Sequence, residues 1–138
     1  MNDITIRPAR PEEIPPALDL ARRVFQEFIR PEGCNRVGAY QPERETMFVA
    51  MAGERMVGMA SQADGCHIRK LYVEGVYHRK GIATGLLDAI IQSMPAARVT
   101  VNASAYALPF YLKYGFTQAG EELRHDGFST IPMAYERT

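Results

Sequence analysis

The chain has 138 residues, of which 46% are hydrophobic and 23% charged, and its 16 basic and 16 acidic side chains leave no formal net charge. This composition is that of a globular domain and excludes a disordered chain, a collagen-like chain and a coiled coil. The zero balance argues against nucleic-acid binding by phosphate neutralisation, and the spacing of two cysteines and three histidines argues against a zinc site.

The first half of the chain predicts a strand, a helix and then a group of antiparallel strands. Alternating apolar residues mark the strands, and apolar residues at helical spacing after Pro11 or Pro16 mark the helix. Turns at Gly53-Glu54 and Asp64-Gly65 predict a hairpin followed by a third strand. These strands cover residues 4–7, 46–51, 55–63 and 66–73, the helix ends at Ile29, and residues 30–43 are expected to form a loop.

The second half predicts alternating helices and strands. The elements are a helix, a strand, a helix closed by Gly115 and two strands, over residues 79–94, 99–101, 106–114, 116–123 and 131–136. The strands on either side of the long helix form a βαβ unit, so we expect them to be parallel. In the first of these strands, simple alternation predicts one face with His67, Arg69, Leu71 and Val73, and another with Ile68, Lys70 and Tyr72.

A short basic loop joins the strand that ends at Val73 to the long helix. Gly81 falls in the first predicted turn, where amide N–H groups have no partner within the helix and carry the positive end of its dipole. Gly81 lets a phosphate approach the backbone, and Arg79 and Lys80 add two cations. The pattern predicts a phosphate or pyrophosphate site. The alternative is a solvated basic loop before an ordinary amphipathic helix, because neither GxGxxG nor a Walker A loop is present.

The same stretch resembles the acetyl-CoA signature Q/R-x-x-G-x-G/A of the GNAT superfamily of N-acyltransferases, which follows a strand ending in a Leu-Tyr-Val-like triplet. The signature maps to residues 78–83, with His78 where the family usually has Gln or Arg, and Gly75 replaces the usual proline after the triplet. Residues 101–116 resemble the family's N-A-S-x-x-A-x-x-F-Y-x-x-x-G-F element. Two blocks in the right order are more specific than either alone, and the predicted elements follow the family's order along essentially the whole chain.

The resemblance implies an α/β fold and one N-acetyltransferase domain over residues 1–138. The expected sheet is mixed and mostly antiparallel, with about six to seven strands, helices on both faces and a central splayed pair of parallel strands. The resemblance also implies that acetyl-CoA is bound, its pantetheine arm by strand backbone and its pyrophosphate by loop and helix amides. The implied cofactor-binding residues are Leu71, Tyr72, Val73, His78, Arg79, Lys80, Gly81, Ile82, Ala83, Thr84 and Asn102.

Tyr111 matches the general acid of the family. A phenol can donate a proton or hydrogen bond to a leaving thiolate, and a backbone N–H near Val73 would polarise the thioester carbonyl. The alternative for Tyr111 is packing of the short helix on the sheet, for which Phe110 and Tyr114 are better candidates. Asn102 equally fits a contact to the pantetheine path or a turn or helix cap, with Ser104 as a rival cap.

The general base is open at this stage. His67 has suitable chemistry, although its position also fits a half-exposed strand residue, and Glu74 is a second choice. Arg69 and Lys70 are unusual for a basic-amine site and suggest an acceptor with a carboxylate.

The acceptor pocket is expected between the first helix, the loop 30–43 and the final hairpin. Candidate wall residues are Phe25, Phe28, Tyr40 and Phe128. The leading interpretation is direct transfer of an acetyl group from acetyl-CoA to a primary amine of a small molecule, peptide or protein in a ternary complex. The alternatives are an O-acyl or longer-chain acyltransferase and a non-catalytic acyl-CoA-binding sensor, against which the presence of Tyr111 argues.

The apolar runs and the charges of the sequence bear on the cellular location of the protein and on its partners. No apolar run approaches the roughly 18 residues that cross a bilayer, and residues 1–10 lack a signal-peptide core. We expect a cytoplasmic monomer or homodimer without metal, membrane or nucleic-acid partners. The neutral total conceals a local anion site, because four cations gather around the proposed cleft: Arg69, Lys70, Arg79 and Lys80.

Overall fold

The computed structural model describes residues 3–29, 39–125 and 127–137. Their strands form an eight-stranded sheet in the order β1-β2-β3-β4-β5-β8-β6, with β7 paired to β8. The strands are β1 (Ile4–Pro8), β2 (Glu45–Ala52), β3 (Arg55–Ala63), β4 (His67–Val73), β5 (Arg98–Ser104), β6 (Thr117–Gln118), β7 (Leu123–Arg124) and β8 (Ser129–Glu136). The helices are α1 (Ile14–Phe28), α2 (Ile82–Gln92) and α3 (Leu108–Tyr114), with short 3-10 turns η1 (Pro11–Glu13) and η2 (Gly75–Tyr77).

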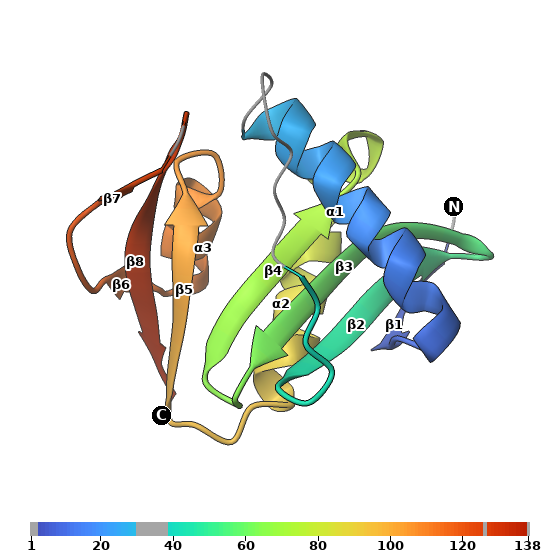
Figure 1. The fold of residues 1–138 in the computed structure, drawn as a ribbon, viewed down its shortest axis with the longest axis horizontal. Helices are drawn as coiled ribbons and strands as arrows, with labels where there is room; N and C mark the ends of the chain where they lie inside the picture. The colour runs from blue at the N-terminus through green and yellow to red at the C-terminus, as the bar shows by residue number, and fades with distance from the viewer. Residues whose placement is uncertain (1–2, 30–38, 126, 138) are drawn as a thin grey trace.

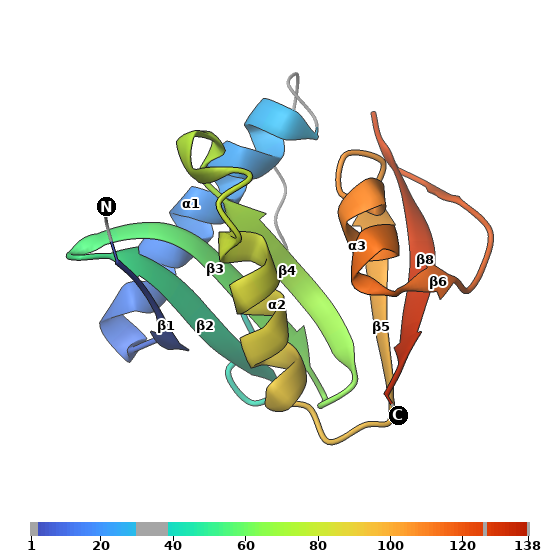
Figure 2. The same ribbon diagram turned by 180° about the vertical axis from the view of Figure 1, so that it is seen from behind.

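The antiparallel half of the sheet, β1 to β4, is covered on both faces. Figures 1 and 2 show α1 on one face and α2 on the other. Alternate residues of each strand point to opposite faces, so one strand serves two cores. On the α1 face, Leu20 packs in a cluster with Val49 and Met59. On the α2 face, Leu86 and Ile90 belong to a larger cluster with Val57, Ala60 and Val99.

The sheet opens between β4 and β5, the parallel pair that the sequence predicts. Their pairing is confined to His67 with Thr100 and Ile68 with Val101. Beyond these residues β4 and β5 diverge, as Figure 1 shows, while β5 stays paired with β8 from Arg98 to Ser104. The mixed α/β fold with a splayed central pair is therefore confirmed, and the splay lies where the candidate site residues gather.

Several element boundaries differ from the predictions for local reasons. The region 116–123 forms two strands of two residues each, β6 and β7, in place of one strand, so the sheet has eight strands within the described ranges. Helix α2 begins at Ile82 and not at Arg79, because Arg79 (φ 64°) and Gly81 (φ 79°) both have left-handed backbone. Strand β5 is longer than the predicted 99–101, since it pairs with β8 throughout.

The predicted alternation of β4 is wrong at one point. Ser61 pairs with Lys70 but the next residue, Gln62, pairs with Ile68, which leaves Arg69 as the extra residue of a β-bulge. The bulge breaks the two-residue period, so Arg69 and Lys70 do not project to opposite sides. Both side chains instead reach the same carboxylate, that of Glu45. Within the described ranges, no helix is long and apolar enough to span a membrane.

Candidate active site

A cavity of about 1080 Å³ lies where β4 and β5 diverge. Its lining comes from the end of α1, β4, the loop before α2, the first turn of α2, β5, α3 and the segment between β7 and β8. The volume is large for a ligand site and leaves room for more than one reactant. Of the predicted site residues, the lining includes Leu71, Tyr72, Val73, His78, Arg79, Gly81, Ile82, Ala83, Thr84, Asn102 and Tyr111. Lys80 and His67 lie outside this lining.

The end of β4 presents backbone groups to the cavity. The Glu74 N–H donates to the Val57 carbonyl of β3 at 2.9 Å. Because successive residues of a strand direct their backbone groups to opposite sides, those of Val73 and Leu71 are directed toward β5. The paired residues of β5 stop at Val101, opposite Ile68, so the edge of β4 beyond that point has no strand partner. An extended ligand could pair with this edge as a strand would.

His78 lies at the Val73 end of the unpaired β4 edge. Its Nε2 lies 2.6 Å from the Val73 carbonyl oxygen, and its Nδ1 lies 2.9 Å from the Tyr106 hydroxyl. A carbonyl only accepts, so Nε2 carries the proton and Nδ1 accepts from Tyr106. Phe28 stacks on Tyr106 with ring centroids 5.0 Å apart and lies 4.8 Å from the His78 ring. The aromatic group joins α1, the loop before α2 and the β5–α3 connection, and the sequence motif alone did not indicate it.

The start of α2 has the features of an anion site. Gly81 is the N-cap of α2, and a side chain at Gly81 would meet no atom within 4 Å. Its left-handed backbone, shared with Arg79, turns the chain into the helix, and the first-turn residues, whose amides lack partners within the helix, line the cavity. The residues fit a pyrophosphate. At Gly85 it is packing that requires a glycine, because a Cβ there would lie 2.6 Å from Ile6 Cδ1 of β1.

Tyr111 belongs both to the core and to the cavity lining. Its side chain is 4% exposed and packs edge-on against Phe110 and Phe116, with centroids 5.3 and 5.2 Å away. Yet Tyr111 also lines the cavity, and no described group forms a hydrogen bond with its hydroxyl. Burial raises the pKa of the Tyr111 phenol, and the nearby Tyr72 phenol adds to the effect. The hydroxyl is therefore a protonated donor at any ordinary pH.

Aromatic side chains form the wall opposite β4. Phe25 of α1 meets Phe128 edge-to-face at 5.2 Å, and His125 stacks on Phe128 at 4.6 Å. His125 Nε2 lies 2.9 Å from Thr130 Oγ1 of β8. Phe25, Phe28 and Phe128 line the cavity as predicted, whereas Tyr40 lies outside the lining and donates to the Glu45 carbonyl at 3.1 Å. The central part of the predicted loop wall, residues 30–38, is outside the described residues.

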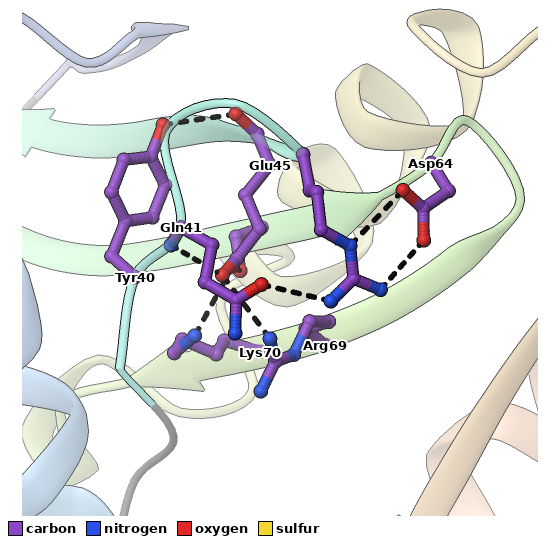
Figure 3. Close-up of polar contacts among 8 residues, drawn as sticks. Tyr40, Gln41, Glu45, Asp64, Arg69 and Lys70 are labelled. Atoms are coloured by element: carbon purple, nitrogen blue, oxygen red, sulfur yellow. Dashed lines mark hydrogen bonds and ion pairs between the residues drawn. The ribbon is translucent and has the colours of Figure 1, made fainter.

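A buried polar cluster on β2, β3 and β4 lies at the base of the splay, next to Ile68 (Figure 3). The Glu45 carboxylate accepts hydrogen bonds from Lys70 Nζ at 3.2 Å, from Arg69 at 3.3 Å, from Ser61 Oγ at 3.0 Å and from the Gln41 N–H at 2.9 Å. The Glu45 and Lys70 side chains are 0% and 2% exposed. Burial lowers the pKa of the Lys70 ammonium, and Glu45 opposes that change. No motif indicates Glu45, which is 25 residues from Lys70.

The two predicted bases are placed apart from the cavity. His67 Nδ1 lies 2.7 Å from Thr100 Oγ1 at the closed end of the β4–β5 pair, and burial lowers the pKa of the imidazole. The Glu74 carboxylate receives hydrogen bonds from Arg23 at 3.0 Å and Arg55 at 2.9 Å. Although burial acts to raise the pKa of Glu74, these two bonds lower it overall. No cluster of three metal-ligating side chains occurs in the part of the chain that the structure describes.

Comparison with known proteins agrees with this geometry. The family model for the acetyltransferase (GNAT) domain matches residues 6–137. The chain therefore belongs to the GNAT acetyltransferase family.

Individual relatives extend the comparison. The chain is 33% identical over 96 residues to the uncharacterized N-acetyltransferase YafP of Escherichia coli K12, a match that covers 67% of the chain and 62% of that relative. A structure described as GCN5-related N-acetyltransferase: aminotransferase, class-II, from Rhodopseudomonas palustris superposes with a TM-score of 0.78 at 20% identity, covering 99% of this chain and 97% of that one. The PaiA N-acetyltransferase of Thermoplasma acidophilum, solved with coenzyme A, gives a TM-score of 0.72 at 17% identity, covering 97% and 99%. The two structures support the fold.

Proposed function

We propose that this protein transfers an acetyl group from acetyl-CoA to a primary amine, by direct attack of the amine within a ternary complex. One observation carries the proposal: a single cavity is lined at once by the first turn of α2, the unpaired edge of β4 and Tyr111. The PaiA structure holds coenzyme A and the YafP relative is described as an N-acetyltransferase, which supports this assignment.

The donor half of the cavity would hold acetyl-CoA. The first-turn amides of α2 and the Arg79 guanidinium would bind its pyrophosphate, because both present positive charge at the cavity lining. The backbone groups of Leu71 and Val73 would pair with the amides of the pantetheine arm. Acetyl-CoA supplies an activated thioester, and the Val73 N–H, directed toward β5, would polarise its carbonyl.

Tyr111 would act on the leaving sulfur. Its hydroxyl has no described competing partner and its raised pKa keeps the proton on the phenol. A thiol has an ordinary pKa near 8.5, well below that of this phenol, so complete proton transfer to a thiolate is uphill. We therefore assign Tyr111 as a hydrogen-bond donor that stabilises the developing negative charge on sulfur, where a buried site strengthens the interaction.

The proton lost by the amine has two candidate acceptors. His67, the candidate from the sequence, hydrogen-bonds Thr100 and lies outside the cavity lining. His125 lines the cavity beside Phe128 and Thr130. Kinetics of His67→Gln and His125→Gln as a function of pH would separate them, because loss of the base removes the acidic limb of the kcat/KM profile.

Thiol release from acetyl-CoA tests the proposed function directly. The purified protein is incubated with acetyl-CoA and a panel of amines, amino acids and peptides, and the free coenzyme A thiol is measured. We expect release that depends on one class of amine. Acetyl-CoA binding without release by any amine would contradict transfer and favour an acyl-CoA-binding sensor.

A further inference from the structure

We propose that the acceptor amine also carries a carboxylate, which Arg69 binds at the base of the β4–β5 splay while the buried Lys70 adds positive charge behind it. This inference rests on the proposed function and names the substrate class of the same cavity. Three observations support it: the positive charge of the cavity lining, the N–H groups of Arg69 that no described residue occupies, and the aromatic lining formed by Phe25 and Phe128.

The cavity lining is positive. Among the described residues that form it, no Asp or Glu occurs, while four positions are Lys or Arg: Arg69, Lys70, Arg79 and Lys113. An acceptor with several ammonium groups would lose its hydration there and find no carboxylate to replace it, which is costly in a partly buried site. A polyamine or a lysine-rich peptide is therefore a poor match to this lining.

The four cations divide between the two halves of the cavity. Arg79 lies two residues before Gly81, the N-cap of α2, where the donor's phosphates are expected, and Lys113 belongs to α3. Arg69 and Lys70 lie next to Ile68, at the point where β4 and β5 part. They are not needed for the pyrophosphate at the start of α2. Their positive charge is left for the acceptor.

The local charge matches a monoanion. Arg69 and Lys70 are two cations and Glu45 is one carboxylate, so the cluster carries one net positive charge. A carboxylate neutralises that charge, whereas a phosphate dianion would leave an excess of one negative charge in a buried site. Glu45 already accepts four hydrogen bonds, so it serves to position the two cations and is not free to bind the ammonium group of an acceptor.

Both cations have donors to spare. Lys70 carries three N–H groups and Arg69 five, and each forms one described hydrogen bond, to Glu45. Lys70 is almost completely buried, so it contributes positive charge and not an open contact to the acceptor. Arg69 is 26% exposed, and a carboxylate placed against its guanidinium would form charge-assisted hydrogen bonds, which are the strong class.

The opposite wall suits an apolar substituent. Phe25 and Phe128 face the cavity from α1 and from the β7–β8 segment, held edge-to-face. Aromatic rings bury apolar groups well, so the remainder of the acceptor is best matched by a hydrocarbon side chain. An apolar amino acid combines the three required parts: an amine, a carboxylate and an apolar group.

The test compares matched acceptors that differ only in the carboxylate. Phenylalanine, phenylalaninamide and phenethylamine form one set, and leucine, leucinamide and isopentylamine form a second. Thiol release gives kcat/KM for each with saturating acetyl-CoA. We expect the amino acid to exceed its amide and its decarboxylated amine by about 10- to 100-fold, the usual range for a hydrogen bond to a charged group.

Variants link that preference to the two cations. Arg69→Gln should reduce the ratio of acid to amine about 10-fold or more, mainly through KM, since binding of the carboxylate is lost while the reacting atoms are untouched. Arg69→Lys keeps the charge and should retain part of the ratio. Arg98→Gln, which removes an exposed arginine paired with Glu136, is the matched control and should leave the ratio unchanged. Because Arg69 is partly exposed, these variants test the site without emptying the core.

The outcomes separate the inference from the proposed function. Preference of the native protein for the amides or decarboxylated amines, or a ratio that Arg69→Gln leaves unchanged, would overturn the carboxylate subsite while acetyl transfer stands. Acetylation restricted to amines without a carboxylate would do the same. Failure of every amine to release thiol would overturn the proposed function itself, and the inference with it.

Discussion

The two proposed halves of the cavity differ in their lining, which is mainly backbone in the donor half and side chains in the acceptor half. The donor half consists mainly of backbone: the open edge of β4 and the first turn of α2, with Gly81 and Arg79 setting the turn. The proposed acceptor half consists of side chains from segments far apart in the sequence: Phe25 of α1, Arg69 and Lys70 of β4, and Phe128 before β8. Glu45 of β2 lies behind this lining and holds the two cations.

Substitutions should therefore affect the two halves in different ways. Substitutions other than proline leave backbone groups in place, so, apart from the Arg79 guanidinium, the donor half is perturbed mainly by changing the conformation of its turn. The side chains of the acceptor half are partly core residues, so changing them alters the stability of the fold as well as the chemistry. We therefore expect donor-half variants to change affinity and acceptor-half variants to change stability or selectivity.

The largest expected effect is on stability in the acceptor half. Glu45→Ala leaves the buried Lys70 ammonium and the Arg69 guanidinium without their common partner, and loss of one member of a buried ion pair costs about 3–5 kcal/mol. Urea denaturation at pH 7 measures the change. The control is Glu136→Ala, which breaks the exposed pair with Arg98 and should cost less than about 1 kcal/mol. Equal losses in the two variants would contradict a supporting role for Glu45.

The next effect is on catalysis, where the two halves meet. Tyr111→Phe keeps the ring and its packing against Phe116 but removes the donor to sulfur, so kcat should fall about 100-fold. The Kd for acetyl-CoA and the melting temperature should stay close to native, since the hydroxyl makes no described hydrogen bond. Tyr135→Phe, outside the cavity lining, serves as the control. An unchanged kcat in Tyr111→Phe would remove Tyr111 from the mechanism.

A smaller effect is expected in the donor half. Gly81→Val places a β-branched residue at φ 79° and forces the turn to relax, which moves the first-turn amides of α2. The Kd for acetyl-CoA should rise about 10- to 100-fold, the equivalent of roughly 1–3 kcal/mol of backbone strain. Gly53→Val is a matched control, because Gly53 is also left-handed and also meets no neighbouring atom within 4 Å, but lies in the β2–β3 turn. Equal loss of affinity in both variants would argue against the α2 site.

The smallest effect concerns pH and His67. Burial lowers the pKa of His67 in the folded state, so below about 6.5 the unfolded chain binds a proton that the folded chain does not. Stability should therefore fall as the pH decreases from about 6.5 toward the folded pKa, and be fully present above 6.5. Urea midpoints at pH 7.5 and 5.5 measure this, and His67→Gln should reduce the difference. An unchanged difference in the variant would assign the pH dependence to other groups.

The same contrast explains what could be predicted from the sequence. The donor half depends on consecutive residues: a strand that ends at Val73, a glycine at the start of α2 and a basic loop between them. Local spacing determines these features, so a motif can indicate them. The exact start of α2 was missed because the left-handed backbone of Arg79, a residue without glycine's freedom, has no local signature.

The acceptor half could not be read in the same way. Glu45 looks like an ordinary charged residue before a strand, and only the pairing of β2, β3 and β4 brings it to Ser61 and Lys70. The bulge at Arg69 shifts the register, which simple alternation cannot reveal. Tyr40 was expected in the pocket wall, yet the same cluster holds it through the Glu45 carbonyl. Long-range contacts decide each of these positions.

Isothermal titration calorimetry with acetyl-CoA tests whether the splayed strands and the start of α2 bind this donor. We expect saturable binding with one site per chain, weakened about 10- to 100-fold in Gly81→Val and unchanged in Gly53→Val. Absence of binding up to about 1 mM acetyl-CoA, equivalent to less than roughly 4 kcal/mol of affinity, would contradict it.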